Sequence, residues 1–330
     1  MSGVTASISL LPVDSVHVTT LIDNSSDALL PDEGLVRRWG LSGTASPLPI
    51  IPDEMADGGK TFDFLRAEHG FSALVEVRHG GSTRRVLFDA GSTPDGLIGN
   101  LDRLSIAPDT FEAIVLSHGH FDHVMGLDGL AERVGRLNLP VLLHPDFWTR
   151  RRMVRDDFPI ELPTPSRSGI EGAGFTIIED RQPSFLLDGM LLVTGEVDRT
   201  TEFETGMPAR HEAWRDDHWE PDRLVHEDQA VVVHVRDKGL VVLTGCGHAG
   251  IVNIVRHAQR LTGISQVYGV LGGFHLREGP VVDLTVAALA EAAPFMVVPA
   301  HCTSWKAQLA LATGIPSAFR PNAVGSRFEF

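Results

Sequence analysis

The sequence predicts an α/β protein, and three observations support this fold class. The chain has 330 residues and is 43% hydrophobic, which is ample for a buried core. Short apolar segments typical of strands alternate with longer amphipathic segments typical of helices. Most strand candidates end in a loop that carries Asp, His or Cys. Chance would not place polar residues at the same end of successive strands, so we expect one site at the carboxyl edge of packed sheets.

The composition restricts the classes of partner. The formal net charge of −15 and the pI near 5.4 disfavour nonspecific binding to nucleic acid or to anionic membranes. No segment approaches the length of a transmembrane helix, and the chain through Asn24 has no Lys or Arg for a signal peptide. We therefore expect a cytoplasmic protein with a small-molecule substrate. Its cysteines, Cys246 and Cys302, are expected as free thiols, with a single disulfide as the alternative.

The first third of the chain reads as strands with one long insertion. An alternating, β-branched segment predicts a strand over Val16–Ile22, and prolines and glycines over about residues 30–60 predict a surface insertion. Strands over Ala73–Arg78 and Arg84–Phe88 follow as a hairpin. A helix is expected over Thr93–Leu104.

A dense cluster of metal-ligand residue types follows the apolar run Ala113–Leu116. His118 and His120 are two apart in an extended segment, so they project the same way and can converge on one cation. Asp122 and His123 come after the chain turns, which aims them at a second cation. Imidazoles with a single carboxylate suit zinc, manganese or iron better than calcium. The spacing therefore predicts a site for one or two metal ions.

The middle of the chain is less regular. A helix over Met125–Leu137 and a strand over Pro140–Leu143 are expected, followed by a helix-like segment, Asp146–Arg152. His144 is interpreted as an ordinary boundary residue. The run Arg150–Arg152 is interpreted as a solvated face.

A polar insertion over about residues 195–226 follows strand candidates at Thr176–Ile178 and Leu186–Val193. Long structured loops often serve as lids. We therefore expect Trp214 and Trp219, at the tip of the insertion, to line the substrate pocket. A surface loop packed by its own tryptophans remains the alternative.

The last third repeats the order strand, polar loop, helix. Expected strands are Ala230–Val235, Gly239–Leu243, Val267–Leu271 and Phe295–Val298, and expected helices are Ile251–Leu261, Val281–Ala292 and Trp305–Ala312. The loops after these strands carry Cys246, His248, His275 and His301.

The sequence resembles the metallo-β-lactamase superfamily in five motifs: Asp89–Gly91, Ser117–His123, Gly245–Gly250, Gly272–Leu276 and His301–Thr303. The resemblance covers roughly Val16 through Ala312. It is closest to a branch of metal-dependent hydrolases that includes proteins similar to dihydropterin–ribofuranosylaminobenzene-phosphate synthase. It implies an αββα sandwich, with residues 1–330 forming one domain that carries the two insertions.

The resemblance also implies a binuclear site with two divalent ions, zinc being preferred and Fe²⁺ or Mn²⁺ the alternatives. Residues that match the superfamily's ligands by position are His118, His120, Asp122, His123 and His301. Asp89 matches an aspartate that supports the ligands from behind.

Two departures from the superfamily pattern leave the other ligands open. Cys246 stands where an aspartate usually bridges two ions, and its softer thiolate would favour zinc or ferrous iron. For the third histidine of the first ion we favour His248, with His226 and Asp228 as alternatives. His275 is assigned to substrate contact or proton transfer, with metal ligation or a structural role as alternatives.

These assignments predict a metal-dependent hydrolase. Activated water would attack an ester, lactone, amide or phosphoester, with Asp122 as proton acceptor and His275 stabilising the oxyanion. One alternative is a phosphoribosyl-type synthase in which the ions clamp a phosphate. Another is a metal-bearing binding protein without turnover. The sequence leaves the substrate and the oligomeric state open.

Overall fold

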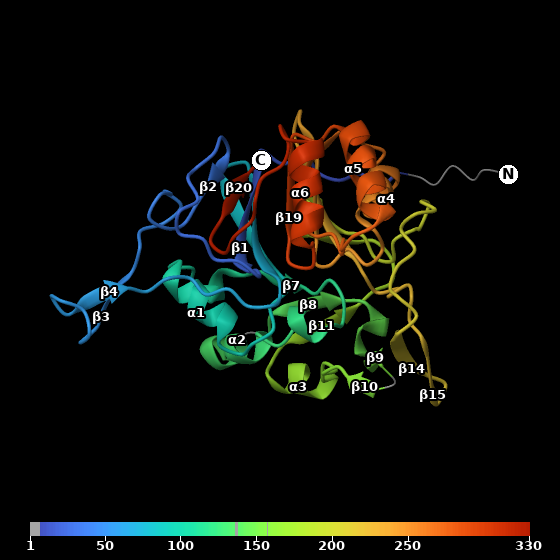
Figure 1. The fold of residues 1–330 in the computed structure, drawn as a ribbon, viewed down its shortest axis with the longest axis horizontal. Coiled ribbons are helices and arrows are strands. Elements are labelled where there is room, and N and C mark those ends of the chain that lie inside the picture. The colour runs from blue at the N-terminus through green and yellow to red at the C-terminus, as the bar shows by residue number, and fades with distance from the viewer. Residues whose placement is uncertain (1–6, 136–137, 157) are drawn as a thin grey trace.

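Two β-sheets packed face to face form the centre of the molecule (Figure 1). The computed structural model describes residues 7–135, 138–156 and 158–330. In spatial order, the eight-stranded sheet contains β11 (Thr176–Glu179), β8 (Pro140–Leu143), β7 (Ala113–Val115), β6 (Ser82–Phe88), β5 (Ser72–His79), β1 (Ser15–Ile22), β20 (Arg327–Glu329) and β2 (Val36–Arg37). The six-stranded sheet contains β12 (Ser184–Leu186), β13 (Leu191–Val193), β16 (Ala230–Val235), β17 (Gly239–Thr244), β18 (Val267–Gly273) and β19 (Met296–Ala300).

Helices cover the outer faces of both sheets. The eight-stranded sheet carries α1 (Gly96–Arg103), α2 (Leu127–Val134) and α3 (Arg167–Gly172). The six-stranded sheet carries α4 (Ile251–Thr262), α5 (Pro280–Ala292) and α6 (Trp305–Gly314). Single 3₁₀ turns are η1 (Pro108–Thr110), η2 (Phe121–His123), η3 (Pro145–Trp148) and η4 (Leu187–Gly189). The order of layers is helix, sheet, sheet, helix, which confirms the expected αββα sandwich.

The alternation of side chains explains this layering. In β5, Val75 and Val77 lie in the core between the two sheets, whereas Leu74 packs under the outer helices. Strand β17 does the same, with Val241 facing the sheet interface and Val242 facing α4. Because successive residues of a strand point to opposite faces, strands that are apolar at every position become buried on both sides. None of the helices in the described residues has the length and hydropathy of a bilayer-spanning segment.

The strands that lead into the polar loops are parallel and end at one edge. In the first sheet β6 pairs in parallel with β7, with Phe88 opposite Val115. In the second sheet β18 pairs in parallel with both β17 and β19. This shared direction brings the loops after these strands together at the same edge of the sandwich.

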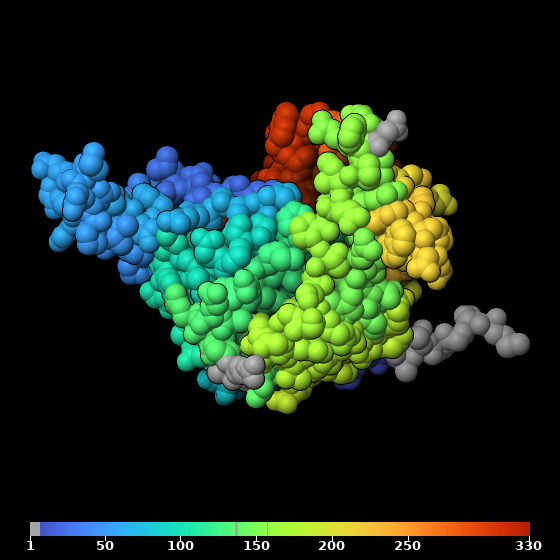
Figure 2. Space-filling model, turned by 90° about the horizontal axis from the view of Figure 1, so that it is seen from below, coloured from blue at the N-terminus to red at the C-terminus, as the bar shows by residue number. Residues whose placement is uncertain are grey.

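Both expected insertions form strands of their own. The first includes a hairpin of β3 (Ile50–Pro52) and β4 (Lys60–Phe62), which stands off the body as an arm (Figures 1 and 2). The second contributes to a four-stranded sheet of β10 (Phe158–Glu161), β9 (Arg151–Arg155), β14 (His211–Arg215) and β15 (His218–Pro221). The second insertion therefore contributes a hairpin to this sheet, whereas its residues 195–210 form no strand.

Two local predictions were wrong. The segment expected to be helix-like over Asp146–Arg152 is the short turn η3 followed by strand β9. The pairing of β9 with β14, for example Met153 with His211, overrides the local preference. The arginine run is not simply a solvated face, because Arg151 is only 2% exposed and forms buried ion pairs.

Several element ends also differ from expectation. Helix α1 begins at Gly96 rather than Thr93. Helix α2 ends at Val134, and the expected end at Leu137 lies outside the described residues. The strand expected over Leu186–Val193 is interrupted by η4, where Leu187 and Asp188 have positive φ angles.

Candidate metal centre

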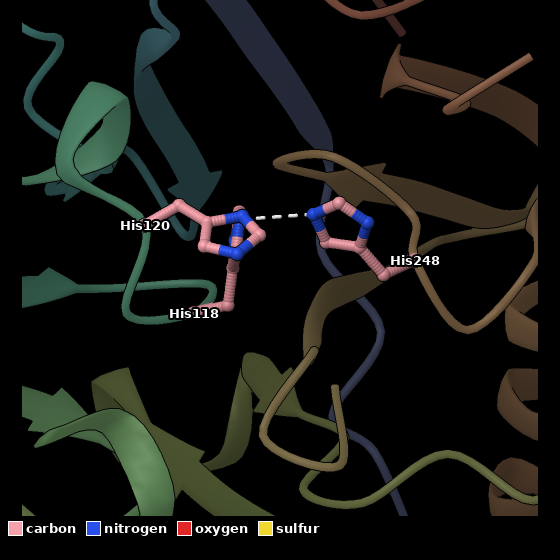
Figure 3. A group of neighbouring side chains, drawn as sticks. All are labelled: His118, His120 and His248. Carbon is pink, nitrogen blue, oxygen red and sulfur yellow. Dashed lines mark hydrogen bonds between the residues drawn. The ribbon is translucent and has the colours of Figure 1, made fainter. Parts of the chain in front are cut away.

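Three buried histidines converge from two loops at the carboxyl edge, and we call them the first cluster: His118, His120 and His248. His118 Nε2 lies 2.9 Å from His120 Nδ1 and 3.2 Å from His248 Nε2. In Figure 3 His248 faces the other two rings from the opposite side, and the dashed line marks this contact. The sequence assignment of the third histidine to His248 agrees with this geometry, whereas His226 is exposed.

Local packing fixes the loop that carries His118 and His120. The loop leaves β7 and passes close to the carbonyl of Phe147, where a Cβ at residue 119 would collide with that oxygen. Only glycine fits at this point, so Gly119 lets the two histidines lie on one compact bend.

Asp89 anchors the same loop from behind. Its carboxylate accepts hydrogen bonds from the Ser117 amide at 2.7 Å and the Ser117 hydroxyl at 2.8 Å. It also accepts one from His123 Nδ1 at 2.6 Å. Asp89 has a φ of 56°, a conformation that non-glycine residues keep only where the surroundings impose it. The structure therefore places Asp89 behind the cluster, where the sequence expectation put it.

A second group of donors lies beside the first, and we call it the second cluster: Asp122, His123, Cys246 and His301. Asp122 Oδ2 lies 3.2 Å from His301 Nε2 and 3.9 Å from His123 Nε2. The Sγ atom of Cys246 lies 3.4 Å from His123 Nε2. His118 links the two clusters, because its ring and that of His123 have centroids 4.3 Å apart.

The hydrogen bonds fix where the protons sit on His118 and His301. The single proton of the Ser117 hydroxyl goes to Asp89, so Ser117 Oγ accepts from His118 Nδ1–H at 2.9 Å. His301 Nδ1 faces the amide oxygen of Asn24 at 3.2 Å and so carries its proton on that side. The Nε2 atoms of both histidines therefore present lone pairs to the clusters.

A third hydrogen-bond chain fixes His120. Its Nε2 lies 3.1 Å from His211 Nε2, and His211 Nδ1 donates to the carbonyl of Asp222 at 3.0 Å. Because His211 has its proton on Nδ1, His120 Nε2 must be the donor to His211. The remaining nitrogen of His120, Nδ1, is then a lone pair that faces His118.

These donors fit a cation. His118 Nε2 has two other ring nitrogens within 3.2 Å, and the lone pairs of His118 Nε2 and His120 Nδ1, which face each other, repel unless a positive charge lies between them. His301 Nε2 is buried without a hydrogen-bond partner in the described residues, yet it lies 3.2 Å from a carboxylate oxygen. Outward-facing nitrogens held by hydrogen bonds and inward-facing lone pairs are the arrangement of metal-ligating histidines.

Burial sets the charge of the first cluster. It lowers the pKa of His118, His120 and His248 well below the usual value, and neighbouring positive groups lower it further. All three rings are therefore neutral, which is the form that binds metals. At His123 burial also lowers the pKa, but the carboxylates of Asp89 and Asp122 outweigh it and raise the pKa to about 9.

His275 and Cys302 border the clusters on the side of the six-stranded sheet. The ring of His275 lies 4.4 Å from that of His248, centroid to centroid. The backbone amide of His275 donates to Cys302 Sγ at 3.3 Å, and both His275 and His301 have a φ of 46°. Both cysteines are free thiols, and Cys302 Sγ lies within 4.8 Å of the donor atoms of Cys246 and His301.

Buried charges of the inserted sheet support the wall of the first cluster. Arg151 pairs with Asp222 at 2.8 Å and with Glu227 at 2.6 Å. Asp228, one of the sequence alternatives for a ligand, instead accepts the backbone amide of Ala249 at 2.8 Å. Burial raises the pKa of Asp228 to about 7. We infer that Asp228 positions the loop of His248 rather than binding metal itself.

Three other residues singled out in the sequence have described contacts outside the clusters. Trp214 and Trp219 pack against each other with centroids 5.3 Å apart, and Arg150 and Arg152 lie over their rings. The described contacts of the two tryptophans thus match the alternative of a self-packed hairpin, and their place in a substrate pocket stays a prediction. His144 contacts Glu196 at 3.1 Å, as a residue at a strand boundary.

Sequence reasoning missed two histidines at the centre. His69 Nε2 lies 3.5 Å from Asp122 Oδ2, and His211 contacts His120. Neither stands in a ligand motif, and each reaches the centre only through long-range packing. The weak signal for His211 was its place in a histidine- and tryptophan-containing insertion.

Comparison with known proteins agrees with this fold. A family model described as the metallo-β-lactamase superfamily matches residues 65–257. The chain therefore belongs to the metallo-β-lactamase superfamily. Two relatives from Methanocaldococcus jannaschii were found. One, named 7,8-dihydropterin-6-methyl-4-(beta-D-ribofuranosyl)-aminobenzene-5'-phosphate synthase, is 30% identical over 249 residues, covering 73% of this chain and 83% of the relative.

The second relative is an uncharacterized protein, 34% identical over 248 residues, covering 73% of this chain and 86% of the relative. Among solved structures, a metal-dependent hydrolase of the beta-lactamase superfamily superposes with a TM-score of 0.68 at 22% identity. The match covers 96% of this chain and 99% of that one. At this identity the superposition supports the fold alone.

Proposed function

We propose that this protein is a metal-dependent hydrolase of a small-molecule ester, lactone, amide or phosphoester. The observation that carries the proposal is the convergence of buried ring nitrogens from His118, His120 and His248 beside the carboxylate of Asp122. The first cluster would hold one divalent ion and the second cluster another. Ions bound there would polarise the substrate and lower the pKa of water to near neutrality.

The chain's own residues divide the remaining work. Asp122 accepts the proton that water loses when its oxygen attacks the acyl or phosphoryl centre, and the leaving alcohol or amine takes a proton in return. His275 borders His248 and can donate a hydrogen bond to the developing oxyanion. Cys246 completes the second cluster, and a sulfur donor among imidazoles fits zinc or ferrous iron.

A second candidate is a synthase that acts on a phosphorylated substrate. The name of the 30% identical relative favours it, because that protein is called a synthase and the compound in its name carries a 5'-phosphate. In this reading the same clusters clamp a phosphate or pyrophosphate and make it the leaving group. A binding protein without turnover is the third possibility, and the experiment below separates the three.

Hydrolysis is tested on the purified, metal-loaded protein. We expect it to cleave at least one member of a panel of aryl esters, lactones and phosphodiesters, and to lose that activity after chelation. Reloading with Zn²⁺ should restore the activity. Pyrophosphate release only when a second, nucleophilic substrate is added would favour the synthase. Stable metal binding with no turnover on either assay would indicate a binding protein.

The His120–His211 hydrogen bond gives a further prediction. Replacing His211 by alanine should weaken binding of the ion in the first cluster by about 10- to 100-fold, the range for losing a group that orients a ligand. Without His211, the His120 ring can carry its proton on Nδ1, which removes the lone pair that faces His118. Zn²⁺ competition against a chromophoric chelator would measure the change.

His218→Ala is the matched control, because His218 lies exposed on the same hairpin. It should keep the wild-type affinity. Equal affinities for His211→Ala and the wild type would show that His211 does not position His120.

A further inference from the structure

A groove leads outward from His301 and Cys302 toward the first turn of α6. Its inner part has a volume of about 370 Å³ and is lined by His301, Cys302, Arg277 and Trp305 among others. An adjoining open part of about 540 Å³ adds Arg210 and Lys306. Arg277, Ser304 and Trp305 line both parts, so the two are continuous. We call this the Trp305 groove.

The outer part of the Trp305 groove is positively charged, although the chain as a whole carries a net charge of −15. Three cations, Arg210, Arg277 and Lys306, line it with a single acid, Glu278. Lys306 pairs with Glu278 at 2.6 Å. Within the described part of the chain, the guanidinium groups of Arg210 and Arg277 have neither a hydrogen bond nor an ion pair. Two unpaired guanidinium groups in one groove indicate an anionic ligand.

The start of α6 adds to this field. Ser304 caps the helix by accepting a hydrogen bond from the Ala307 amide, and Ser304, Trp305 and Lys306 at this positive end of the helix line the groove. Free amides at a helix start favour phosphate-like anions. Because two arginines, a lysine and a helix end offer more donors than a carboxylate can use, a phosphate group matches the set better.

Trp305 supplies a flat surface beside these cations. It is the first residue of α6 and is 71% exposed, unusual for a large aromatic side chain. An exposed indole on the wall of a groove can stack on a planar ring. Trp305 lines the inner part together with His301 and the outer part together with Arg210 and Lys306, so a ring stacked on it would border both parts.

We propose that the Trp305 groove binds a substrate with a flat ring and a phosphate group, with the ring against Trp305 and the phosphate at Arg277 and Arg210. The bond to be broken then lies at the His301 end of the groove. This inference rests on the proposed function for the role of that end, and it names the chemical class of substrate.

Calorimetric titration of the Zn²⁺-loaded protein with phenylphosphonate tests the inference. Phenylphosphonate carries both a ring and a phosphate-like anion, and inorganic phosphate and benzamide serve as half probes. We expect phenylphosphonate to bind at least about tenfold more tightly than either half probe, since each part adds its own contact. Benzoate should bind more weakly, because a carboxylate uses fewer donors.

Two variants locate the binding. Arg277→Gln should lower the affinity for phenylphosphonate by about tenfold or more, which is the loss expected when a charged hydrogen bond is removed. Trp305→Ala should lower the affinity for phenylphosphonate but leave the affinity for inorganic phosphate unchanged. Matched controls are Arg236→Gln, at the opposite end of the six-stranded sheet, and Leu309→Ala, exposed on the same helix. Both controls should bind as the wild type does.

Three results would overturn the inference. Wild-type affinity in both Arg277→Gln and Trp305→Ala would place the phosphonate on the metal ions alone. Equal affinities for benzoate and phenylphosphonate would reassign the groove to carboxylates. If phenylphosphonate does not bind at all, the Trp305 groove is not a binding site for this class of ligand. Titration needs no turnover, so the two proposals can fail separately. Failure of the hydrolysis panel would overturn the proposed function and leave the binding of phenylphosphonate as measured. Absence of phenylphosphonate binding would overturn the inference and leave the measured hydrolysis as it is.

Discussion

The Asp122→Asn variant is expected to lose turnover by about 10²- to 10⁴-fold, the range typical of removing a group that transfers protons. Asp122 Oδ2 faces His301 Nε2 at 3.2 Å, His69 Nε2 at 3.5 Å and His123 Nε2 at 3.9 Å. Burial raises the pKa of Asp122, but the positive charge of His123 outweighs it and holds the pKa well below its usual value. The carboxylate is therefore charged, and asparagine keeps its shape while removing the charge and the proton acceptor.

Steady-state kinetics on the substrate found in the panel, together with metal analysis, would check this expectation. We expect the first cluster to keep its ion, because Asp122 is not part of it, and the second cluster to bind more weakly. Asp128→Asn is the matched control, since Asp128 lies exposed on α2 a few residues away. Turnover within about threefold of the wild type in Asp122→Asn would remove Asp122 from the proposed catalytic role.

The layered fold was predictable because its signal is local. A strand buried on both faces is apolar at successive positions, as in Val241-Val242-Leu243, and such runs stand out in the sequence. The expected strands Ala230–Val235 and Gly239–Leu243 correspond closely to β16 and β17. Strand β9 was missed because its stability comes from pairing with β14, some sixty residues later, and no local pattern reports that partner.

The same distinction applies to the metal centre. Six consecutive residues contain His118, His120 and His123, so the convergence of these histidines follows from local geometry. His248 could be favoured over His226 because it follows β17, a strand that ends at the same edge of the sandwich as β7. His211 could not be placed in this way, because it reaches His120 only when the inserted sheet docks against the sandwich. Residue pairs far apart in sequence carry no spacing signal.

Three residues of the candidate metal centre have positive φ angles, which the conformational preference of Asp and His alone does not explain. Asp89, His275 and His301 all occupy the left-handed region at the ends of different strands. Each such residue costs on the order of 1 kcal/mol or more, and persists only where surrounding contacts impose it. At His301 these contacts include a hydrogen bond from its amide to Asp23 at 2.7 Å. Other non-glycine residues with positive φ, such as Asp216 and Asp237, lie in hairpin turns, so these three are the ones that shape the candidate site.

The Cys246→Ser variant is expected to lose the ion of the second cluster. Cys246 Sγ is buried 3.4 Å from His123 Nε2, and its sulfur lies within 4.8 Å of donor nitrogens of His118 and His123. Burial raises the pKa of this thiol well above its usual value, so the thiolate forms only when a cation displaces the proton. Serine keeps the size but is a far poorer anionic donor, and the remaining donors Asp122, His123 and His301 then bind the ion loosely.

Cys246→Asp separates ligation from mere packing at this position. A carboxylate is a harder donor than a thiolate, so this variant should keep part of the metal and shift its preference from Zn²⁺ or Fe²⁺ toward Mn²⁺. Metal content and identity are measured by elemental analysis after growth with equal amounts of the three metals. Cys302→Ser is measured alongside, because the donor atoms of Cys302, Cys246 and His301 lie within 4.8 Å of one another, and loss of the ion in that variant would add Cys302 to the ligands. If Cys246→Ser and Cys246→Asp both keep the wild-type metal content and identity, Cys246 is a small buried residue and the second ion depends on Asp122, His123 and His301 alone.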